Sequence, residues 1–256
     1  MGAPTVFITG ANSGIGAALA RYYASHGARL GLFARRAAEL DALAGDLHAN
    51  PVATYAGDVR DAHALSRAAN EFMARFGVPD IVIANAGVSR GTLTEHGEDL
   101  SAFRAVFDTN VLGLVHTFHP FVAAMRDARR GALVGIASVA GFRGLPGSGA
   151  YSASKAAAIT YLESLRVEMR GSGVAVITIC PGYIATPMTA NNPYRMPFLL
   201  SADAAARRIA HAVSRKKRLY VFPWPMALVG RALRALPRPL YDFAFSRAPR
   251  KPRQPS

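Results

Sequence analysis

Residues 5–16 read TVFITGANSGIG, from Thr5 to Gly16. The first five are apolar or β-branched and are typical of a buried strand. Gly10 allows a sharp turn out of that strand, and Gly14 and Gly16 lack the Cβ atoms that would keep a backbone away from a phosphate. A helix that follows would point its free N–H groups at the same phosphate. The spacing is G-x3-G-x-G rather than G-x-G-x-x-G, and many tight turns use such glycines. The interpretation as a dinucleotide turn therefore depends on its place after the first strand.

The rest of the chain alternates short apolar runs with longer helical patterns. Continuous Val/Ile-rich strands that alternate with helices predict a parallel sheet covered by helices on both faces, and no linker divides the core. The predicted strands are 5–9, 29–33, 52–56, 81–84, 132–137, 174–179 and 219–222. The predicted helices are 15–26, 36–48, 61–76, 99–126, 151–170 and 202–214.

Length and composition favour one large α/β domain in a reducing compartment. The chain has 256 residues, of which 51% are apolar, enough for a sizeable core. A single cysteine, Cys180, excludes an intrachain disulfide. The first ten residues run into a strand without the pattern of a signal peptide, and no apolar run is long enough to span a bilayer. We therefore expect a cytoplasmic protein.

The net charge of +14 is unevenly distributed. Residues 203–256 hold 13 Lys/Arg against 2 Asp/Glu, whereas residues 1–202 hold 17 against 14. The excess near the C-terminus favours an anionic surface such as membrane lipid, nucleic acid or an acidic partner. A solvated tail that only aids solubility is the alternative.

The stretch SVAGFRGLPGSGAYSASK, residues 138–155, carries acid–base chemistry. Tyr151 and Lys155 stand at i and i+4, so on a helix they share one face. An ammonium close to a phenol favours the phenolate and lowers a tyrosine pKa that is otherwise about 10. Ser138, at the end of a predicted strand, can hydrogen-bond the oxygen of a carbonyl or alcohol. This set transfers protons but needs a partner that carries electrons, and it calls for no metal.

The end of the second predicted strand reads Phe33-Ala34-Arg35-Arg36. NAD-binding units place an acid here for the ribose 2′-hydroxyl, whereas a guanidinium can bind a 2′-phosphate through two hydrogen bonds. We therefore expect NADP(H) to be preferred over NAD(H). The alternative is a pair of surface arginines at the start of the second helix.

Together these motifs resemble the short-chain dehydrogenase/reductase family over about residues 4–215. The resemblance rests on Thr9–Gly16, Asn85-Ala86-Gly87, Asn110, Ser138, Tyr151 with Lys155, and Pro181-Gly182 with Thr186, in this order and spacing. It implies a doubly wound, Rossmann-like sheet of seven parallel strands. It also implies hydride transfer to or from C4 of a nicotinamide. Ala84 replaces the first Asn often seen in the family's motif at this place, while Asn85 is present.

By this likeness, Tyr151 is the general acid/base and Ser138 orients and polarises the substrate oxygen. Lys155 holds the nicotinamide ribose and lowers the pKa of Tyr151, and Asn110 anchors a water that extends the proton relay. Asp58 meets the adenine amino group, with Val59 beside it. The cofactor positions that the likeness implies, together with the two arginines, are Gly10, Asn12, Ser13, Gly14, Ile15, Gly16, Arg35, Arg36, Asp58, Val59, Asn85, Ala86, Gly87, Tyr151, Lys155, Pro181, Gly182, Ile184 and Thr186.

The substrate is indicated only by the segment 183–200, which is rich in Met, Tyr, Phe and Leu and poor in charge. Such a cover over the nicotinamide suits an apolar substrate, although it could also be a loop packed on its own core. Our main hypothesis is an NADP(H)-dependent enzyme that interconverts a hydrophobic, lipid-like ketone and its secondary alcohol. The alternatives are a reductase of 3-oxoacyl thioesters on a carrier protein and a non-catalytic NADP-binding scaffold.

Residues 1–222 are expected to form the catalytic domain, and residues 223–256 a basic extension. Met226, Val229, Leu233 and Leu236 fall on one side of a helical wheel, opposite two arginines and after Trp224. This pattern indicates either an interfacial anchor on the inner face of a membrane or a helix that docks on the domain or a second subunit. No nucleic acid is expected, because no recognised binding motif is present. The family likeness suggests a homodimer or homotetramer formed through helices 99–126 and 151–170.

Overall fold

The computed structural model describes residues 3–47, 50–190 and 192–253. Its main sheet has seven strands in the order β3-β2-β1-β4-β5-β6-β9, and every neighbouring pair is parallel. The strands are β1 (Thr5–Thr9), β2 (Arg29–Ala34), β3 (Val52–Ala56), β4 (Ile81–Ala84), β5 (Ala132–Ile136), β6 (Ala175–Pro181) and β9 (Leu219–Phe222). All seven predicted strands are present, with ends that differ by at most two residues.

Both faces of the sheet are buried, as β1 illustrates. Val6 and Ile8 belong to the hydrophobic cluster on one face, whereas Phe7 belongs to the cluster on the other. The ring of Phe7 lies 4.9 Å from that of Phe121 and meets the ring of Phe72 edge-on at 5.4 Å, centroid to centroid. Successive side chains of a strand point to opposite faces, so an unbroken apolar strand requires cover on both.

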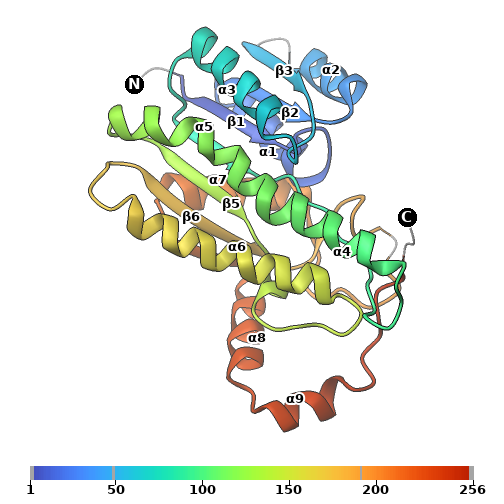
Figure 1. The fold of residues 1–256 in the computed structure, drawn as a ribbon. Helices are drawn as coiled ribbons and strands as arrows, with labels where there is room; N and C mark the ends of the chain where they lie inside the picture. Colours follow the sequence, from blue (N-terminus) through green and yellow to red (C-terminus); the bar gives the residue numbers. More distant parts are fainter. Residues whose placement is uncertain (1–2, 48–49, 191, 254–256) are drawn as a thin grey trace.

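Helices supply that cover in two layers (Figure 1). One face is covered by α1 (Gly14–Ala24), α2 (Ala37–Asp46) and α7 (Ala202–Ser214). The other is covered by α3 (Ala62–Phe76), α5 (Gly113–Asp127) and α6 (Gly149–Glu168). The doubly wound, Rossmann-like fold is therefore confirmed.

The strand order reverses direction at β1, because β2 lies on one side of it and β4 on the other. The loop after β1 leads to α1 on one face of the sheet, whereas the chain after β4 leads to α5 on the other face. In open α/β sheets a crevice forms at this point, and ligands bind there.

The predicted helix 99–126 is interrupted. It consists of α4 (Asp99–Phe107), a π-helical turn at Asp108–Leu112, and α5. The wider turn carries Asn110, whose side chain is 1% exposed and fully hydrogen-bonded to neighbouring segments. Single π-turns inside helices often mark functional positions, and the apolar pattern that predicts a helix does not reveal them.

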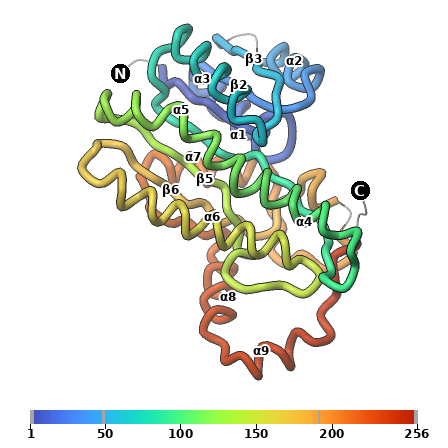
Figure 2. Tube along the Cα trace, in the orientation of Figure 1, coloured from blue at the N-terminus to red at the C-terminus, as the bar shows by residue number. Residues whose placement is uncertain are grey.

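The chain after β9 forms α8 (Trp224–Ala235) and α9 (Arg238–Phe245), which extend from the body of the molecule, as the ribbon and the tube drawn in the same orientation show (Figures 1 and 2). α8 docks through Met226, which lies against Gly182, and through Gly230, which lies against the ring of Phe142. On the predicted apolar side Met226 is buried, whereas Val229 is 42% exposed, and the packing face also includes a glycine. α9 was not predicted, since it is short and begins with prolines.

The segment 183–200 is closed at its base by a second, two-stranded sheet. β7 (Ile184–Ala185) pairs in parallel with β8 (Leu200–Ser201), and the rings of Tyr183 and Tyr194 lie 6.3 Å apart. No helix within the described residues is long and apolar enough to cross a bilayer.

Candidate active site

A cavity of about 470 Å³ opens at the carboxyl ends of the central strands. Residues from the loops after the strands β1 to β6 line it, together with the start of α6. Most of the residues that the sequence predicts for the site share this one cavity. They are Gly10, Asn12, Ser13, Gly14, Ile15, Arg35, Arg36, Val59, Asn85, Ala86, Gly87, Ser138, Tyr151, Lys155, Pro181, Gly182, Ile184 and Thr186.

The glycine turn after β1 fits a phosphate-binding role. Gly14 has a φ of 54° and begins α1, and the first α-helical hydrogen bond runs from Ala17 N to Ser13 O, 3.3 Å. The amides of the first turn therefore have no acceptor within the helix, and a ligand can use them. Gly16 does not line the cavity, because its role is packing: a Cβ there would collide with the carbonyl oxygen of Gly10.

Asn85 connects the first and fourth strands at the floor of the cavity. Its Nδ2 donates to the carbonyl oxygens of Thr9, 3.1 Å, and Gly10, 3.2 Å. The side chain thereby fixes the glycine turn against the loop that follows β4. The site's opposite wall comes from Thr186, whose Cγ2 would lie 3.1 Å from a Cβ on Gly14.

Ser138, Tyr151 and Lys155 form the polar end of the cavity. Ser138 Oγ accepts a hydrogen bond from Ala140 N at 3.1 Å, and its own O–H can donate toward Tyr151. Lys155 Nζ donates to the carbonyl oxygen of Ile136 at 2.8 Å and lies 5.8 Å from the centroid of the Tyr151 ring. The ammonium has two further donors, which can reach a ligand in the cavity.

The expected lowering of the Tyr151 pKa is not met in this structure. Burial raises the pKa of Tyr151, a hydrogen bond from Ser138 opposes the rise, and Tyr194 adds to it. Burial also lowers the pKa of Lys155 to about 8. Because the Lys155 ammonium is directed at a backbone carbonyl, it does not offset the desolvation of the phenol. The Tyr151 hydroxyl carries its proton at neutral pH, as an unperturbed phenol also does, and its raised pKa makes it a weaker acid than a free tyrosine.

Asn110 does not line the cavity, but its hydrogen bonds hold together segments that do. Its Oδ1 accepts from Val88 N at 2.8 Å, and its Nδ2 donates to Val88 O at 2.9 Å and to Ser154 Oγ at 3.0 Å. These bonds join the loop after β4 to α6, the helix that carries Tyr151. In this structure the side chain therefore acts as a positioning group.

The cavity is strongly cationic. Arg35, Arg36, Arg90 and Lys155 line it, and none of the described residues that line it has a carboxylate side chain. A polyanionic ligand such as a dinucleotide fits this charge.

Asp58, predicted to contact adenine, lies outside the lining. Arg60 donates to its carboxylate from Nη2, 2.7 Å, and Nε, 3.0 Å. Burial acts to raise the pKa of Asp58, but the Arg60 hydrogen bonds outweigh it and hold that pKa below its usual value. With Asp58 neutralised by Arg60, the Arg35 guanidinium, 4.0 Å away and 63% exposed, keeps its charge available to a ligand.

Several lining residues were not predicted. Val88, Ser89 and Arg90 directly follow the Asn85-Ala86-Gly87 turn, so their position in the chain could have indicated them. Thr109 had no such signal, because its position depends on the π-helical turn at Asp108–Leu112. Within the described residues, no group of three His, Cys, Asp or Glu side chains is placed to hold a metal ion.

Sequence comparison agrees with this geometry. Residues 4–196 match the family description "short chain dehydrogenase". The chain belongs to this family.

Among its relatives, an uncharacterized oxidoreductase from Myxococcus xanthus is 40% identical over 95% of this chain and 96% of its own length. The 11-beta-hydroxysteroid dehydrogenase 1A of Arabidopsis thaliana is 34% identical over 85% of this chain and 68% of its own. An alcohol dehydrogenase structure from Thermococcus sibiricus, complexed with 5-hydroxy-NADP, is 26% identical, with a TM-score of 0.77 over 86% of this chain and 95% of that one.

Short-chain dehydrogenases are oxidoreductases that bind a nicotinamide cofactor, and the residues of this cavity fit such a group. The α1 amides could hold its pyrophosphate, and Arg35 and Arg36 lie at the end of β2, where the adenosine ribose is expected. When bound, the nicotinamide supplies or accepts the hydride.

Proposed function

We propose that this protein is an NADP(H)-dependent enzyme that interconverts a hydrophobic ketone and its secondary alcohol. The observation that carries the proposal is a single cavity that combines the Ser138–Tyr151 pair with four cations and, within the described lining, no carboxylate side chain. The pair provides proton transfer to a C–O group, and the cations favour a cofactor with an additional phosphate.

In reduction, Tyr151 donates its hydroxyl proton to the carbonyl oxygen of the substrate. Ser138 donates a hydrogen bond to the same oxygen, since its Oγ already accepts from Ala140 N and its O–H can donate to the substrate in place of Tyr151. Both groups stabilise the negative charge that develops on that oxygen. Lys155 supplies fixed positive charge at the same end and holds the cofactor ribose through its remaining donors.

The hydrophobic character of the substrate is supported by the cover segment 183–200. Met188, Phe198 and Leu199 on this segment are 41%, 53% and 45% exposed, and Met188 lines the cavity. Apolar side chains left in water can be buried by an apolar ligand, which makes binding of a long-chain ketone favourable.

A series of methyl ketones of rising chain length, assayed with NADPH and with NADH, tests this function. We expect kcat/KM with NADPH to increase with chain length, by about tenfold for every two added methylenes at about 0.8 kcal/mol each. A preference for small polar ketones would contradict the hydrophobic substrate. Preference for a 3-oxoacyl thioester would favour the carrier-protein alternative, and absence of turnover with all substrates would favour the scaffold alternative.

We also propose that the extension 223–256 brings this enzyme to an anionic membrane surface. Trp224 and Leu228 on α8 are 72% and 54% exposed, and Leu240 and Phe243 on α9 are 57% and 84% exposed. Exposed arginines accompany them on both helices. Apolar side chains next to cations are typical of interfacial binding.

Flotation with vesicles tests this surface. The wild-type protein is expected to float with vesicles that contain phosphatidylserine, and the double variant Trp224→Ser, Phe243→Ser is expected to lose most of this binding. Leu219→Ser, which removes an exposed apolar residue from β9, is the control. Equal flotation of all three proteins would contradict a role for α8 and α9.

A homo-oligomer formed through α4–α5 and α6 stays a prediction. It is supported by exposed apolar residues on these helices and on the π-helical turn between α4 and α5, namely Leu100, Phe103, Leu112 and Val167. The molar mass in solution, measured by light scattering, tests it.

A further inference from the structure

The end of the chain returns to the rim of the candidate active site. Residues 250–253 lie against the loop that follows β4, and Gly91 forms a parallel bridge with Arg253. A Cβ on Gly91 would collide with the carbonyl oxygen of Pro252, so the two segments are in direct backbone contact. On its other side, Arg250 lies against Gly147, in the loop before α6.

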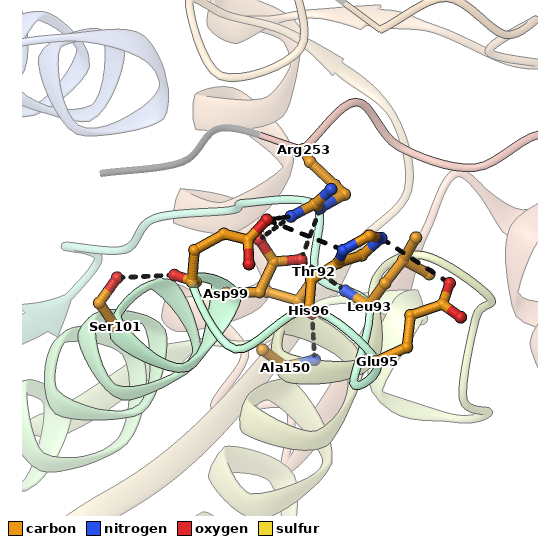
Figure 3. A network of polar contacts seen from close by, with 9 residues as sticks. Thr92, Leu93, Glu95, His96, Asp99, Ser101, Ala150 and Arg253 are labelled. Carbon is orange, nitrogen blue, oxygen red and sulfur yellow. Dashed lines mark hydrogen bonds and ion pairs between the residues drawn. The ribbon is translucent and has the colours of Figure 1, made fainter.

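Arg253 fastens this segment. Its guanidinium donates to both carboxylate oxygens of Asp99, at 2.8 and 3.1 Å, and to Glu98 at 2.6 Å (Figure 3). Asp99 is only 3% exposed and also accepts from Leu93 N at 2.8 Å. A bidentate pair with a buried, positioned carboxylate is among the stronger arginine contacts. The segment 250–253 is therefore held in a defined place on the enzyme.

Lys251 occupies the position between these attachments. Its Nζ donates to Ser89 Oγ at 2.8 Å, and Ser89 and its neighbour Arg90 line the cavity that contains Tyr151. The side chain is half-buried, and burial lowers the pKa of its ammonium. Among the described residues, no carboxylate lies within ion-pair distance of Lys251 or of Arg90.

Two cations without a carboxylate partner at the rim of a cavity indicate a site for an anion. Partial burial of an ammonium has a cost that an anionic group of a ligand would offset. The cofactor phosphates are expected elsewhere, at α1 and at the end of β2, so the rim cations are left for the substrate.

We propose that residues 250–253 form part of the substrate site, and that Lys251, assisted by Arg90, binds a carboxylate on the substrate remote from its carbonyl. This inference rests on the proposed function and narrows it to oxo acids, molecules with an apolar chain between a ketone and a terminal acid. Apolar cover residues would contact the chain, while Tyr151 and Lys251 would contact its two polar ends.

The test uses methyl-ketone fatty acids of rising length, each compared with its methyl ester, in the presence of NADPH. Esterification removes the charge and leaves the chain and the ketone unchanged. For the wild-type enzyme, kcat/KM is expected to be at least about tenfold higher for the acid than for the ester at the best chain length. In Lys251→Gln this ratio should fall about tenfold, whereas Lys251→Arg should retain most of it.

Lys216→Gln is the matched control, because it removes one lysine charge from an exposed position outside the cavity lining. Its acid-to-ester ratio is expected to equal that of the wild type. The proposed carboxylate site is refuted, and the proposed function stands, if the oxo acids and their methyl esters are both reduced at the ketone but the acid-to-ester ratio of kcat/KM is near one. The same holds if this ratio is unchanged in Lys251→Gln. If no ketone of either kind is reduced, the proposed function fails first.

Discussion

Replacing Tyr151 with Phe is expected to lower kcat for ketone reduction by about 10²–10⁴-fold, the usual contribution of a positioned general acid. The variant keeps the aromatic ring and removes only the hydroxyl. The helix α6 and the contact between the ring at position 151 and the Lys155 ammonium therefore remain. The wild-type hydroxyl is protonated throughout the neutral range, since the pKa of Tyr151 lies above the already high ordinary value of a phenol, so a proton is present for transfer. Single-turnover measurements with NADPH isolate the chemical step.

Tyr161→Phe is the control for this substitution. Tyr161 lies on the same helix, packs against the core on one face of the sheet and does not line the cavity. We expect its kcat to stay within about twofold of the wild type, since a change away from reacting groups has little effect on the rate. Equal rates for Tyr151→Phe and the wild type would remove Tyr151 from the mechanism and, with it, the main argument for this function.

The sheet could be predicted from the sequence because its strands are buried on both faces. A run such as Val6-Phe7-Ile8 has no polar residue to place in water, and strand–helix alternation then allows few topologies. The glycine turn and the Tyr151–Lys155 pair could be recognised because each is local. Their residues are neighbours in the chain, and the turn or helix that they form brings them together without help from distant segments.

Features that depend on distant parts of the chain were not predictable. The π-helical turn at Asp108–Leu112 carries Asn110, whose side chain is hydrogen-bonded to Val88 and Ser154, residues 22 and 44 positions away. The attachment of Arg253 to Asp99 spans 154 positions. No periodicity encodes such contacts, so residues 250–253 contributed to the sequence analysis only as part of an excess of positive charge.

The Tyr151 pKa shows the same limit in energetic terms. The i and i+4 spacing places Lys155 near the Tyr151 ring, but the ammonium donates to Ile136 O, a group that the spacing does not reveal. Desolvation then dominates, and the pKa of Tyr151 rises instead of falling.

Arg35→Asp is expected to reduce the preference for NADPH over NADH, expressed as the ratio of the two kcat/KM values, by about 10–100-fold. A hydrogen bond to a charged group contributes about 1.5–3 kcal/mol, and the new carboxylate would also repel a 2′-phosphate. Asp58 does not already supply this repulsion in the wild type, because Arg60 neutralises it from 2.7 Å. The change should therefore appear mainly as a higher KM for NADPH, with a smaller effect on NADH.

Arg67→Asp separates this local effect from the change in net charge. Arg67 is an exposed residue of α3 outside the cavity lining, and the same substitution there is expected to leave the cofactor ratio within about twofold of the wild type. An unchanged ratio in Arg35→Asp would mean that the cationic end of β2 does not recognise the 2′-phosphate, and the preference for NADP(H) would lose its structural basis. Arg36 already forms an ion pair with Glu39 at 2.8 Å, so the Arg35 guanidinium is the more available of the two for a 2′-phosphate. Position 35 is therefore the more informative one to substitute.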